Sequence, residues 1–327
     1  MKLASLDDGT PDGRLIVVAR DLSRAVPADH IAPNLLAAIE GWDAVASDLR
    51  LLFDALNAGE ATQAAPLDVA KLAAPLPRTW QWLDGSVFRS HVDLSIEAYG
   101  VADVWGDAPL MYQGMSHRFL PPHGEVRFPS ADDGIDFEGE FAVITGPVAM
   151  GADCETAGQA IRLVGQLNDW SLREQGREEM KRGYGWIHAK PACTMAPVVV
   201  TPDELGPAWL NYRCDLALEI DRNGERFGAA NGIEMAFGFD ALVAHAAYSR
   251  DLPAGTIIGS GTVANSDYRR VGSSCILERR GIEIIDGGAA QTPFLRHGEE
   301  IRMRAVDHGA TAPFGEMISR IATGGDA

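Results

Sequence analysis

Three carboxylates alternate with apolar side chains in one short stretch of the chain, Ile135-Asp136-Phe137-Glu138-Gly139-Glu140-Phe141. In an extended strand, successive side chains point to opposite faces, so Asp136, Glu138 and Glu140 would share one face. Closely spaced carboxylates repel one another unless a divalent cation neutralises them, and hard cations bind oxygen ligands. The stretch therefore predicts either a hard-cation site or the solvated side of a strand whose other side is core.

Two aspartates elsewhere in the chain could supply further oxygen ligands. Asp169 lies in Asn168-Asp169-Trp170-Ser171, after a helix that apolar spacing predicts at about residues 156–167. Asp84 lies in Trp82-Leu83-Asp84-Gly85-Ser86. Each aspartate also has a simpler interpretation, because polar clusters often end helices and Asp-Gly pairs often form turns.

Three other side chains could transfer a proton or stabilise a charge. His91 lies seven residues after Asp84, and Lys190 precedes Pro191, which favours an extended backbone. Glu278 ends an apolar run that predicts a strand and leads into two arginines. Considered singly, these residues would be a structural histidine, a solvated lysine and a glutamate paired with those arginines.

The elements that would carry these residues form a small region and a large one. Residues 1 to about 75 predict an α+β unit, with a strand at 15–19 and helical spacing over 35–56 that Gly41 could interrupt. The proline-rich stretch 72–78 cannot continue a helix. We therefore place a domain boundary there, which divides the chain into residues 1–75 and 76–327.

Strand signals dominate the second region. Runs rich in β-branched residues occur at 141–144, 198–200, 257–258 and 282–285. Alternation over 212–220 leads to Asn223-Gly224, a favoured hairpin turn. The predicted helices, at about 156–167 and 238–250, are too few for a regular βαβ repeat. The predicted fold class is α+β, with a mixed, mainly antiparallel sheet or roll.

The composition limits the partners of the chain. Its 46 acidic and 28 basic residues give a net charge of −18, which repels nucleic acid and anionic membranes, so we expect neither as a partner. An anionic substrate would need a local cation. The sequence has no apolar segment of signal-peptide or membrane-spanning length, and its four cysteines form no C-x-x-C pair. These features predict a cytoplasmic protein with buried thiols.

Taken together, the motifs resemble those of the fumarylacetoacetate hydrolase family over about residues 72–310. The matching segments are Asp84 with His91, Pro109-Leu110-Met111-Tyr112-Gln113-Gly114, Asp136-Phe137-Glu138-Gly139-Glu140, Asn168-Asp169-Trp170-Ser171-Leu172-Arg173, Lys190, Gly259-Ser260-Gly261-Thr262 and Ile276-Leu277-Glu278. The resemblance implies a mixed β-roll catalytic domain behind a small N-terminal domain, assembled as a homodimer.

The resemblance also implies roles for individual residues. The metal ligands would be Asp84, Glu138, Glu140 and Asp169, an all-oxygen set that suits Mg²⁺ or Ca²⁺, with Mn²⁺ as a further candidate. The catalytic residues would be His91, Glu278 and Lys190. The substrate-binding residues would be Arg173, Tyr112, Gln175, Thr262 and Ser86.

The activity implied by the resemblance is hydrolysis of a carbon–carbon bond in a β-diketo acid, fumarylacetoacetate or a related acylpyruvate, as in tyrosine and other aromatic catabolism. His91, oriented by Glu278, would take a proton from water, and Lys190 would stabilise the oxyanion. A keto-acid decarboxylase, hydratase or tautomerase could use the same metal site, and a non-catalytic metal-binding domain could retain it.

The chain departs from the family pattern at four positions. Ala189 precedes the site lysine where the family has glycine, and Ser86 stands in place of a tyrosine. Gly176, adjacent to Gln175, stands in place of a glutamine, and Gly100 in place of an arginine. These changes indicate a substrate pocket altered from that of the tyrosine-catabolism enzyme.

Overall fold

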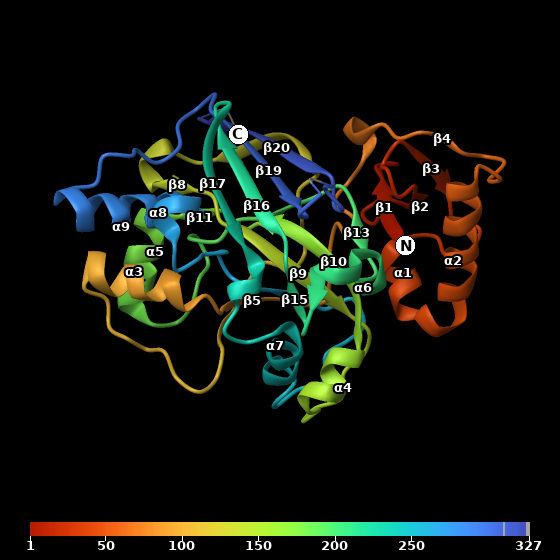
Figure 1. Ribbon diagram of the computed structural model, residues 1–327, viewed down its shortest axis with the longest axis horizontal. Helices are drawn as coiled ribbons and strands as arrows, with labels where there is room; N and C mark the ends of the chain where they lie inside the picture. Colours follow the sequence, from red (N-terminus) through yellow and green to blue (C-terminus); the bar gives the residue numbers. More distant parts are fainter. Residues whose placement is uncertain (310, 325–327) are drawn as a thin grey trace.

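The computed structural model describes residues 1–309 and 311–324 of the chain. Residues 310 and 325–327, which belong to the predicted second domain, lie outside the described part. Most strands belong to two β-sheets, one of eleven strands and one of five. The smaller sheet crosses the middle of the larger one, and helices surround the pair (Figure 1).

The large sheet carries most of the predicted site residues. Its strands, in order across the sheet, are β4 (Ala65–Pro66), β3 (Arg24–Pro27), β2 (Arg14–Val18), β1 (Lys2–Leu6), β13 (Val199–Val200), β10 (Ile161–Asn168), β9 (Gly139–Thr145), β18 (Ile257–Gly259), β5 (Trp82–Ser86) and β6 (Leu110–Gln113), with β12 (Thr194–Met195) paired to β10. Within this eleven-stranded sheet, the described strand pairs are antiparallel, apart from β18 with β5, which are parallel. The central strands β9 and β10 are buried along almost their whole length, because other elements cover both faces of the sheet.

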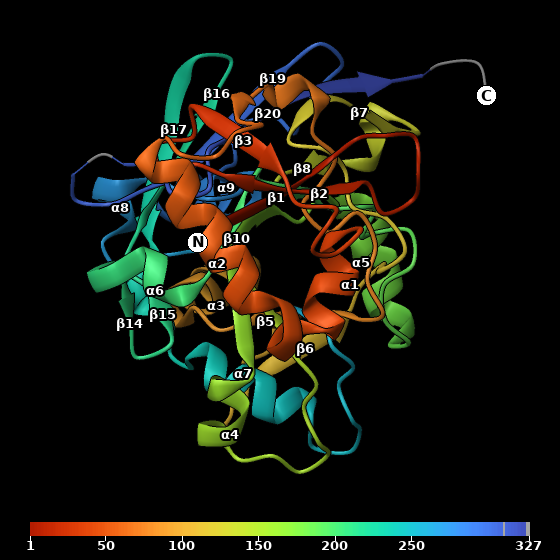
Figure 2. The same cartoon turned by 90° about the vertical axis from the view of Figure 1, so that its right-hand side faces the viewer.

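The N-terminal region extends one edge of this sheet. β1 pairs with β13, so residues far apart in sequence, such as Lys2 and Val200, lie side by side. The predicted helical stretch forms α1 (Leu35–Glu40) and α2 (Trp42–Ala58), separated at Gly41 as expected. The buried residues of α2 are Leu49, Phe53 and Leu56, which lie on one face of its second half, and the helix packs against β2 (Figure 2). The domain boundary near residue 75 stays a prediction.

The smaller sheet contains the predicted hairpin. Its strands, in order, are β17 (Glu225–Asn231), β16 (Ala217–Arg222), β19 (Glu300–Val306), β20 (Glu316–Thr323) and β7 (His123–Phe128). Asn223 and Gly224 form the turn between β16 and β17, which confirms that prediction. Two short pairs lie outside both sheets: β8 (Ile135–Asp136) with β11 (Ser171–Leu172), and β14 (Trp209–Leu210) with β15 (Arg213–Cys214). The predicted α+β fold with a mixed, mainly antiparallel sheet is confirmed.

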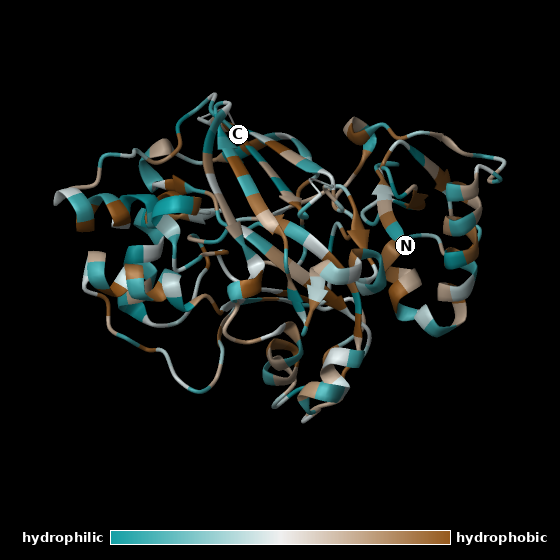
Figure 3. Ribbon diagram, viewed as in Figure 1, coloured by the Kyte–Doolittle hydropathy of each residue, from teal (hydrophilic) through white to brown (hydrophobic). Residues whose placement is uncertain are grey.

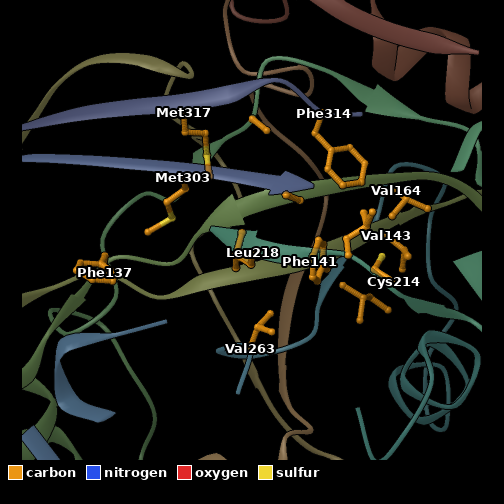
Figure 4. Close-up of a cluster of buried hydrophobic side chains, with 14 of the residues drawn as sticks. Phe137, Phe141, Val143, Val164, Cys214, Leu218, Val263, Met303, Phe314 and Met317 are labelled. Carbon is orange, nitrogen blue, oxygen red and sulfur yellow. The ribbon is translucent and has the colours of Figure 1, made fainter. Parts of the chain in front are cut away.

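Apolar side chains fill the space between the two sheets. Phe141 of β9, Leu218 of β16 and Met303 of β19 point into one buried cluster (Figure 4). Figure 3 shows hydrophobic segments along the central strands of the two sheets, as well as on the surrounding helices. At Gly139 a β-carbon would come within 2.7 Å of Leu218 Cδ2, so this position has no room for a side chain. The close packing fixes the backbone beside Glu140.

The helices lie mainly around the sheets. They are α3 (Arg89–Tyr99), α4 (Cys154–Gln159), α5 (Arg173–Arg182), α6 (Pro202–Leu205), α7 (Phe239–Ala246), α8 (Tyr268–Val271) and α9 (Ile276–Gly287), with 3₁₀ turns η1 (Val69–Lys71), η2 (Ala131–Asp133), η3 (Gly206–Ala208) and η4 (Gly232–Glu234). α3 packs against α9, at the left of Figure 1. None of the described helices is long and apolar enough to cross a membrane.

Three secondary-structure predictions are wrong. The helix expected at 156–167 is the short helix α4 followed by strand β10. Its apolar residues follow a helix-like spacing because the strand is buried on both faces and has no polar side to alternate with. The strands expected near 274–278 and at 282–285 are instead the N-terminus and body of α9. Its β-branched residues favoured a strand locally, and packing against α3 favours the helix.

Candidate functional site

Three carboxylates meet at the centre of the large sheet. Asp84 lies in β5, Glu140 in β9, and Asp169 directly follows β10. One carboxylate oxygen from each lies within 4.8 Å of the others, and all three side chains are buried. The sheet order places these strand segments close together, because β10, β9, β18 and β5 are successive neighbours.

The cluster is electrostatically unfavourable without a cation. Burial, with added repulsion from neighbouring carboxylates, raises the pKa of both Asp84 and Glu140 well above the usual range. Among the described residues, no donor reaches either carboxylate oxygen of Glu140. At Gly259 a β-carbon would lie 2.5 Å from Asp84 Oδ1 and 2.9 Å from Glu140 Oε2, so the glycine leaves space beside both groups. These residues fit a hard divalent cation bound by oxygen.

Glu138 lies beside this cluster but has different partners. Its Oε2 accepts a hydrogen bond from Lys190 Nζ at 2.5 Å, and its Oε1 forms an ion pair with Arg173 Nη2 at 2.7 Å. Burial alone would raise the pKa of Glu138, but the charges of Lys190 and Arg173 lower it to about 2. The role of Glu138 as a metal ligand stays a prediction.

Asp136 takes a third position. Its Oδ1 accepts a hydrogen bond from Ile276 N–H at 2.7 Å, and its Oδ2 accepts one from Leu277 N–H at 2.9 Å, at the first turn of α9. Arg173 Nε also donates to Oδ2, at 2.8 Å. Asp136, Glu138 and Glu140 are all buried, so the interpretation of this stretch as the solvated side of a strand is wrong. Asp136 and Glu138 share Arg173 as a partner, whereas Glu140 belongs to the carboxylate cluster.

His91 and the buried Glu278 form a pair between α3 and α9. His91 Nδ1 lies 3.2 Å from Glu278 Oε1, and Oε2 accepts a hydrogen bond from Ser274 N–H at 3.3 Å. Burial works to lower the pKa of His91, but the hydrogen bond and charge of Glu278 raise it overall. The adjacent arginines bind backbone carbonyls elsewhere, so the expected pairing of Glu278 with Arg279 and Arg280 is wrong.

Lys190 and Tyr112 share one oxygen of the carboxylate cluster. Both donate to Asp169 Oδ2, at 2.6 Å each, and Lys190 Nζ lies 5.4 Å from the centre of the Tyr112 ring. Burial opposes the charged form of Lys190, but Asp169 and Glu138 raise its pKa, so the ammonium stays protonated. The structure therefore brings Lys190, Tyr112 and Arg173 to the carboxylates, as expected from their order in the chain.

The other predicted substrate-binding residues are less closely connected to the cluster. Ser86 ends β5, and its Cα lies near the loop after β18, since a β-carbon on Gly261 would come within 2.9 Å of it. Thr262 lies in that loop and is buried. Gln175 points elsewhere, because its amide donates to Asp133 Oδ1 at 2.8 Å.

Two residues at the site carry no clear sequence signal. Cys193 Sγ donates a hydrogen bond to the second oxygen of Asp169, at 3.0 Å, although the sequence predicts it simply as a buried thiol. Trp186 stands edge-on to Tyr112, with ring centres 6.4 Å apart, and its ring lies 3.7 Å from where a β-carbon on Gly176 would be. The tryptophan ring thus lies against the position where the resemblance implies a glutamine.

Two family models match the chain. Residues 82–322 match the family model described as Fumarylacetoacetate (FAA) hydrolase C-terminal, and residues 1–78 match Fumarylacetoacetase N-terminal domain 2.

Among curated relatives, an uncharacterized protein of Pyrococcus abyssi is 26% identical over 55% of this chain and 79% of its own length. Fumarylacetoacetase of Caenorhabditis elegans is 25% identical over 66% of this chain and 62% of its own length. A mitochondrial oxaloacetate tautomerase of Xenopus laevis is 24% identical over 47% of each. The chain thus spans less than two thirds of the length of these two enzymes.

Two solved structures cover essentially the whole chain. Maleylpyruvate hydrolase of Sphingobium sp. SYK-6, in complex with manganese(II) and pyruvate, has a TM-score of 0.66 at 17% identity, covering 99% of this chain and 100% of that one. The 5-carboxymethyl-2-hydroxymuconate delta-isomerase of Mycobacterium smegmatis has a TM-score of 0.62 at 16% identity, covering 100% of both chains. At these identities the likeness concerns the fold.

Proposed function

The chain belongs to the fumarylacetoacetate hydrolase family, and from this premise we propose that it hydrolyses a carbon–carbon bond in a β-diketo acid, fumarylacetoacetate or a related acylpyruvate. One observation carries the proposal: a buried cluster of three carboxylates lies beside a partly buried histidine–glutamate pair. Glu138 connects the two, since its charge acts on His91 and its carboxylate binds the lysine that contacts Asp169.

The three carboxylates would hold a divalent cation, for which Mg²⁺, Ca²⁺ and Mn²⁺ are the candidates. Such a cation would polarise the carbonyl of a bound diketo acid and so favour attack on it. The ammonium of Lys190 would stabilise negative charge that develops on the carbonyl oxygen. Arg173 is held by Asp136 and Glu138, so its charge contributes to the site from a fixed position.

His91 would act as the general base. A carboxylate can only accept hydrogen bonds, so Glu278 holds the proton of His91 on Nδ1 and leaves Nε2 free to accept one. Nε2 would take a proton from water while the water oxygen bonds to the carbonyl carbon. The carbon–carbon bond then breaks, and the proton taken from water passes to the leaving carbon, so that a carboxylic acid and a keto acid are released. Glu278 acts here as a positioning residue.

Removal of divalent cations should abolish turnover. We expect absorbance of fumarylacetoacetate and of a series of acylpyruvates to fall in the presence of Mg²⁺ and to stay constant with excess chelator. Loss of absorbance in both conditions would contradict a role for a cation. Chelator-sensitive formation of two acids would support the hydrolase and rank its substrates.

A second candidate function is keto-acid tautomerisation, decarboxylation or hydration at the same site. The relative named as an oxaloacetate tautomerase and the neighbour named as an isomerase favour it, because both share this family or fold with hydrolases. Product analysis distinguishes the candidates. A tautomerase or isomerase conserves the number of carbons in the substrate, a decarboxylase releases carbon dioxide, and a hydrolase gives two acids.

The activity should fall at low pH because His91 must be neutral to accept a proton. Glu278 raises the pKa of His91 above its usual value of 6.5, so the acidic limb of kcat/KM should lie above pH 6.5. Glu278→Gln removes the charge that raises this pKa, and burial then dominates. The limb should therefore move to lower pH in that variant. A limb that is identical in the two proteins would exclude His91 as the titrating base.

A further inference from the structure

The histidine–glutamate pair has a third neighbour that the proposed hydrolysis does not use. Cys275 immediately precedes α9, and one donor atom each of His91, Cys275 and Glu278 lies within 4.8 Å of the others. We propose that these three residues form a second cation site, which prefers Zn²⁺ or Cd²⁺ to Mg²⁺ and inhibits the enzyme when occupied. This inference goes beyond the proposed function, since binding at the site does not require a particular substrate.

The geometry is close to that of a zinc site. Tetrahedral zinc with nitrogen and oxygen ligands at about 2.0–2.1 Å separates those two atoms by about 3.3 Å. His91 Nδ1 and Glu278 Oε1 are 3.2 Å apart, so the distance between these two ligands already fits. Cys275 is held nearby as the N-cap of α9, where its Sγ accepts a hydrogen bond from Glu278 N–H at 3.3 Å. Helix α3, which carries His91, packs against α9, which carries Glu278 (Figure 1).

The donor set favours a borderline-soft ion. An imidazole nitrogen, a thiolate sulfur and a carboxylate oxygen suit Zn²⁺ or Cd²⁺, whereas Mg²⁺ requires near-octahedral oxygen coordination. The charge of a dication is cancelled by the thiolate and the carboxylate, so the occupied cluster is neutral, as a buried site should be. The cluster of Asp84, Glu140 and Asp169 offers oxygen alone and suits the hard ion. The two sites would therefore distinguish the two kinds of cation.

The site is accessible from one side. The side chain of His91 is 17% exposed, whereas those of Glu278 and Cys275 are buried. An ion would enter past the imidazole, and water would fill the fourth position. On binding, the Cys275 thiol releases its proton to solvent, and the imidazole proton moves from Nδ1 to Nε2. The nitrogen that would accept a proton from water is then protonated, so catalysis stops while Mg²⁺ stays bound.

The test compares three forms of the full chain in excess Mg²⁺: the natural protein, Cys275→Ser and Cys154→Ser. Serine is a good N-cap, so Cys275→Ser keeps the start of α9 and removes the soft ligand. Cys154 is exposed, and its replacement controls for adventitious binding at a surface thiol. Cd²⁺ titration is followed by the ultraviolet thiolate-to-metal absorbance, which does not depend on activity. Zn²⁺ inhibition is expressed relative to each protein's own zinc-free rate.

We expect the natural protein and Cys154→Ser to bind one Cd²⁺ with this absorbance. Loss of an outer partner of a metal ligand typically costs 10- to 100-fold in affinity, so loss of a ligand in Cys275→Ser should cost at least about 100-fold. Zn²⁺ inhibition should weaken in parallel, and added Mg²⁺ should not relieve it in the natural protein.

Three results would overturn the inference: unchanged Cd²⁺ absorbance in Cys275→Ser, its loss in Cys154→Ser, or inhibition that Mg²⁺ relieves equally in all forms. The last would place the inhibitory ion at the carboxylates. Cys275→Ala is the substitute if the serine variant fails to fold. The Cd²⁺ titration tests the second site even if the protein turns over no diketo acid. Failure of the proposed function and failure of the second site are therefore distinguishable.

Discussion

Replacement of His91 by alanine should lower kcat/KM by about 10²- to 10⁴-fold while Mg²⁺ binding remains intact. The neutral imidazole of His91 can accept a proton at Nε2, because its Nδ1 is held by Glu278. It does not belong to the cluster of Asp84, Glu140 and Asp169, so its loss leaves those carboxylates in place. The measurements are steady-state kinetics on the best acylpyruvate and calorimetric titration with Mg²⁺.

His245→Ala is the matched control, because this histidine is exposed on α7. We expect its kinetics to equal those of the natural protein. Hydrolysis retained in His91→Ala would remove the general-base assignment. Simultaneous loss of activity and Mg²⁺ binding in that variant would instead show that His91 supports the metal centre.

The order of motifs along the chain predicted much of the site. Asp84, Glu140 and Asp169 converge in the structure, and Lys190 and Tyr112 contact Asp169, although these residues are spread over more than one hundred positions. Single motifs could not predict this convergence. Sheet order decides it, because β5 and β9 become near neighbours through β18, which comes much later in the chain.

The wrong secondary-structure predictions have two physical origins, burial of a strand on both faces and contacts between residues far apart in sequence. Strand β10 is covered on both faces, so it shows no polar alternation and its apolar residues match a helix by chance of spacing. The first turn of α9 is stabilised by Asp136, a residue about 140 positions earlier, whose carboxylate accepts two of its N–H groups. The local pattern of isoleucines contains no information about the hydrogen bonds from Asp136 that stabilise the start of this helix. Long-range hydrogen bonds also decide that Glu138 contacts Lys190 and Arg173, which alternation alone could not predict.

Glu140→Gln and Glu138→Gln should change stability in opposite directions. The folded pKa of Glu140 lies well above its unfolded value of 4.5, so near neutral pH the unfolded chain ionises more readily and this carboxylate destabilises the metal-free fold. Glu140→Gln removes this buried carboxylate and should therefore raise the free energy of unfolding in chelator. Glu138→Gln removes one of the two carboxylates that each of Lys190 and Arg173 contacts. It should therefore lower the free energy of unfolding by about 1.5–3 kcal/mol, as expected for loss of a hydrogen bond between charged groups.

The affinity for Mg²⁺ should also differ between Glu140→Gln and Glu138→Gln. Glu140→Gln removes one of three oxygens around the proposed cation, so Mg²⁺ affinity and turnover should both fall by at least about 100-fold, although the protein is more stable. Urea unfolding in chelator and calorimetric titration with Mg²⁺ give the two quantities independently. Destabilisation by Glu140→Gln would contradict repulsion within the cluster. An equal loss of Mg²⁺ affinity in a folded Glu138→Gln would show that Glu138 leaves Lys190 and joins the ligands when the cation binds, as the family resemblance implies.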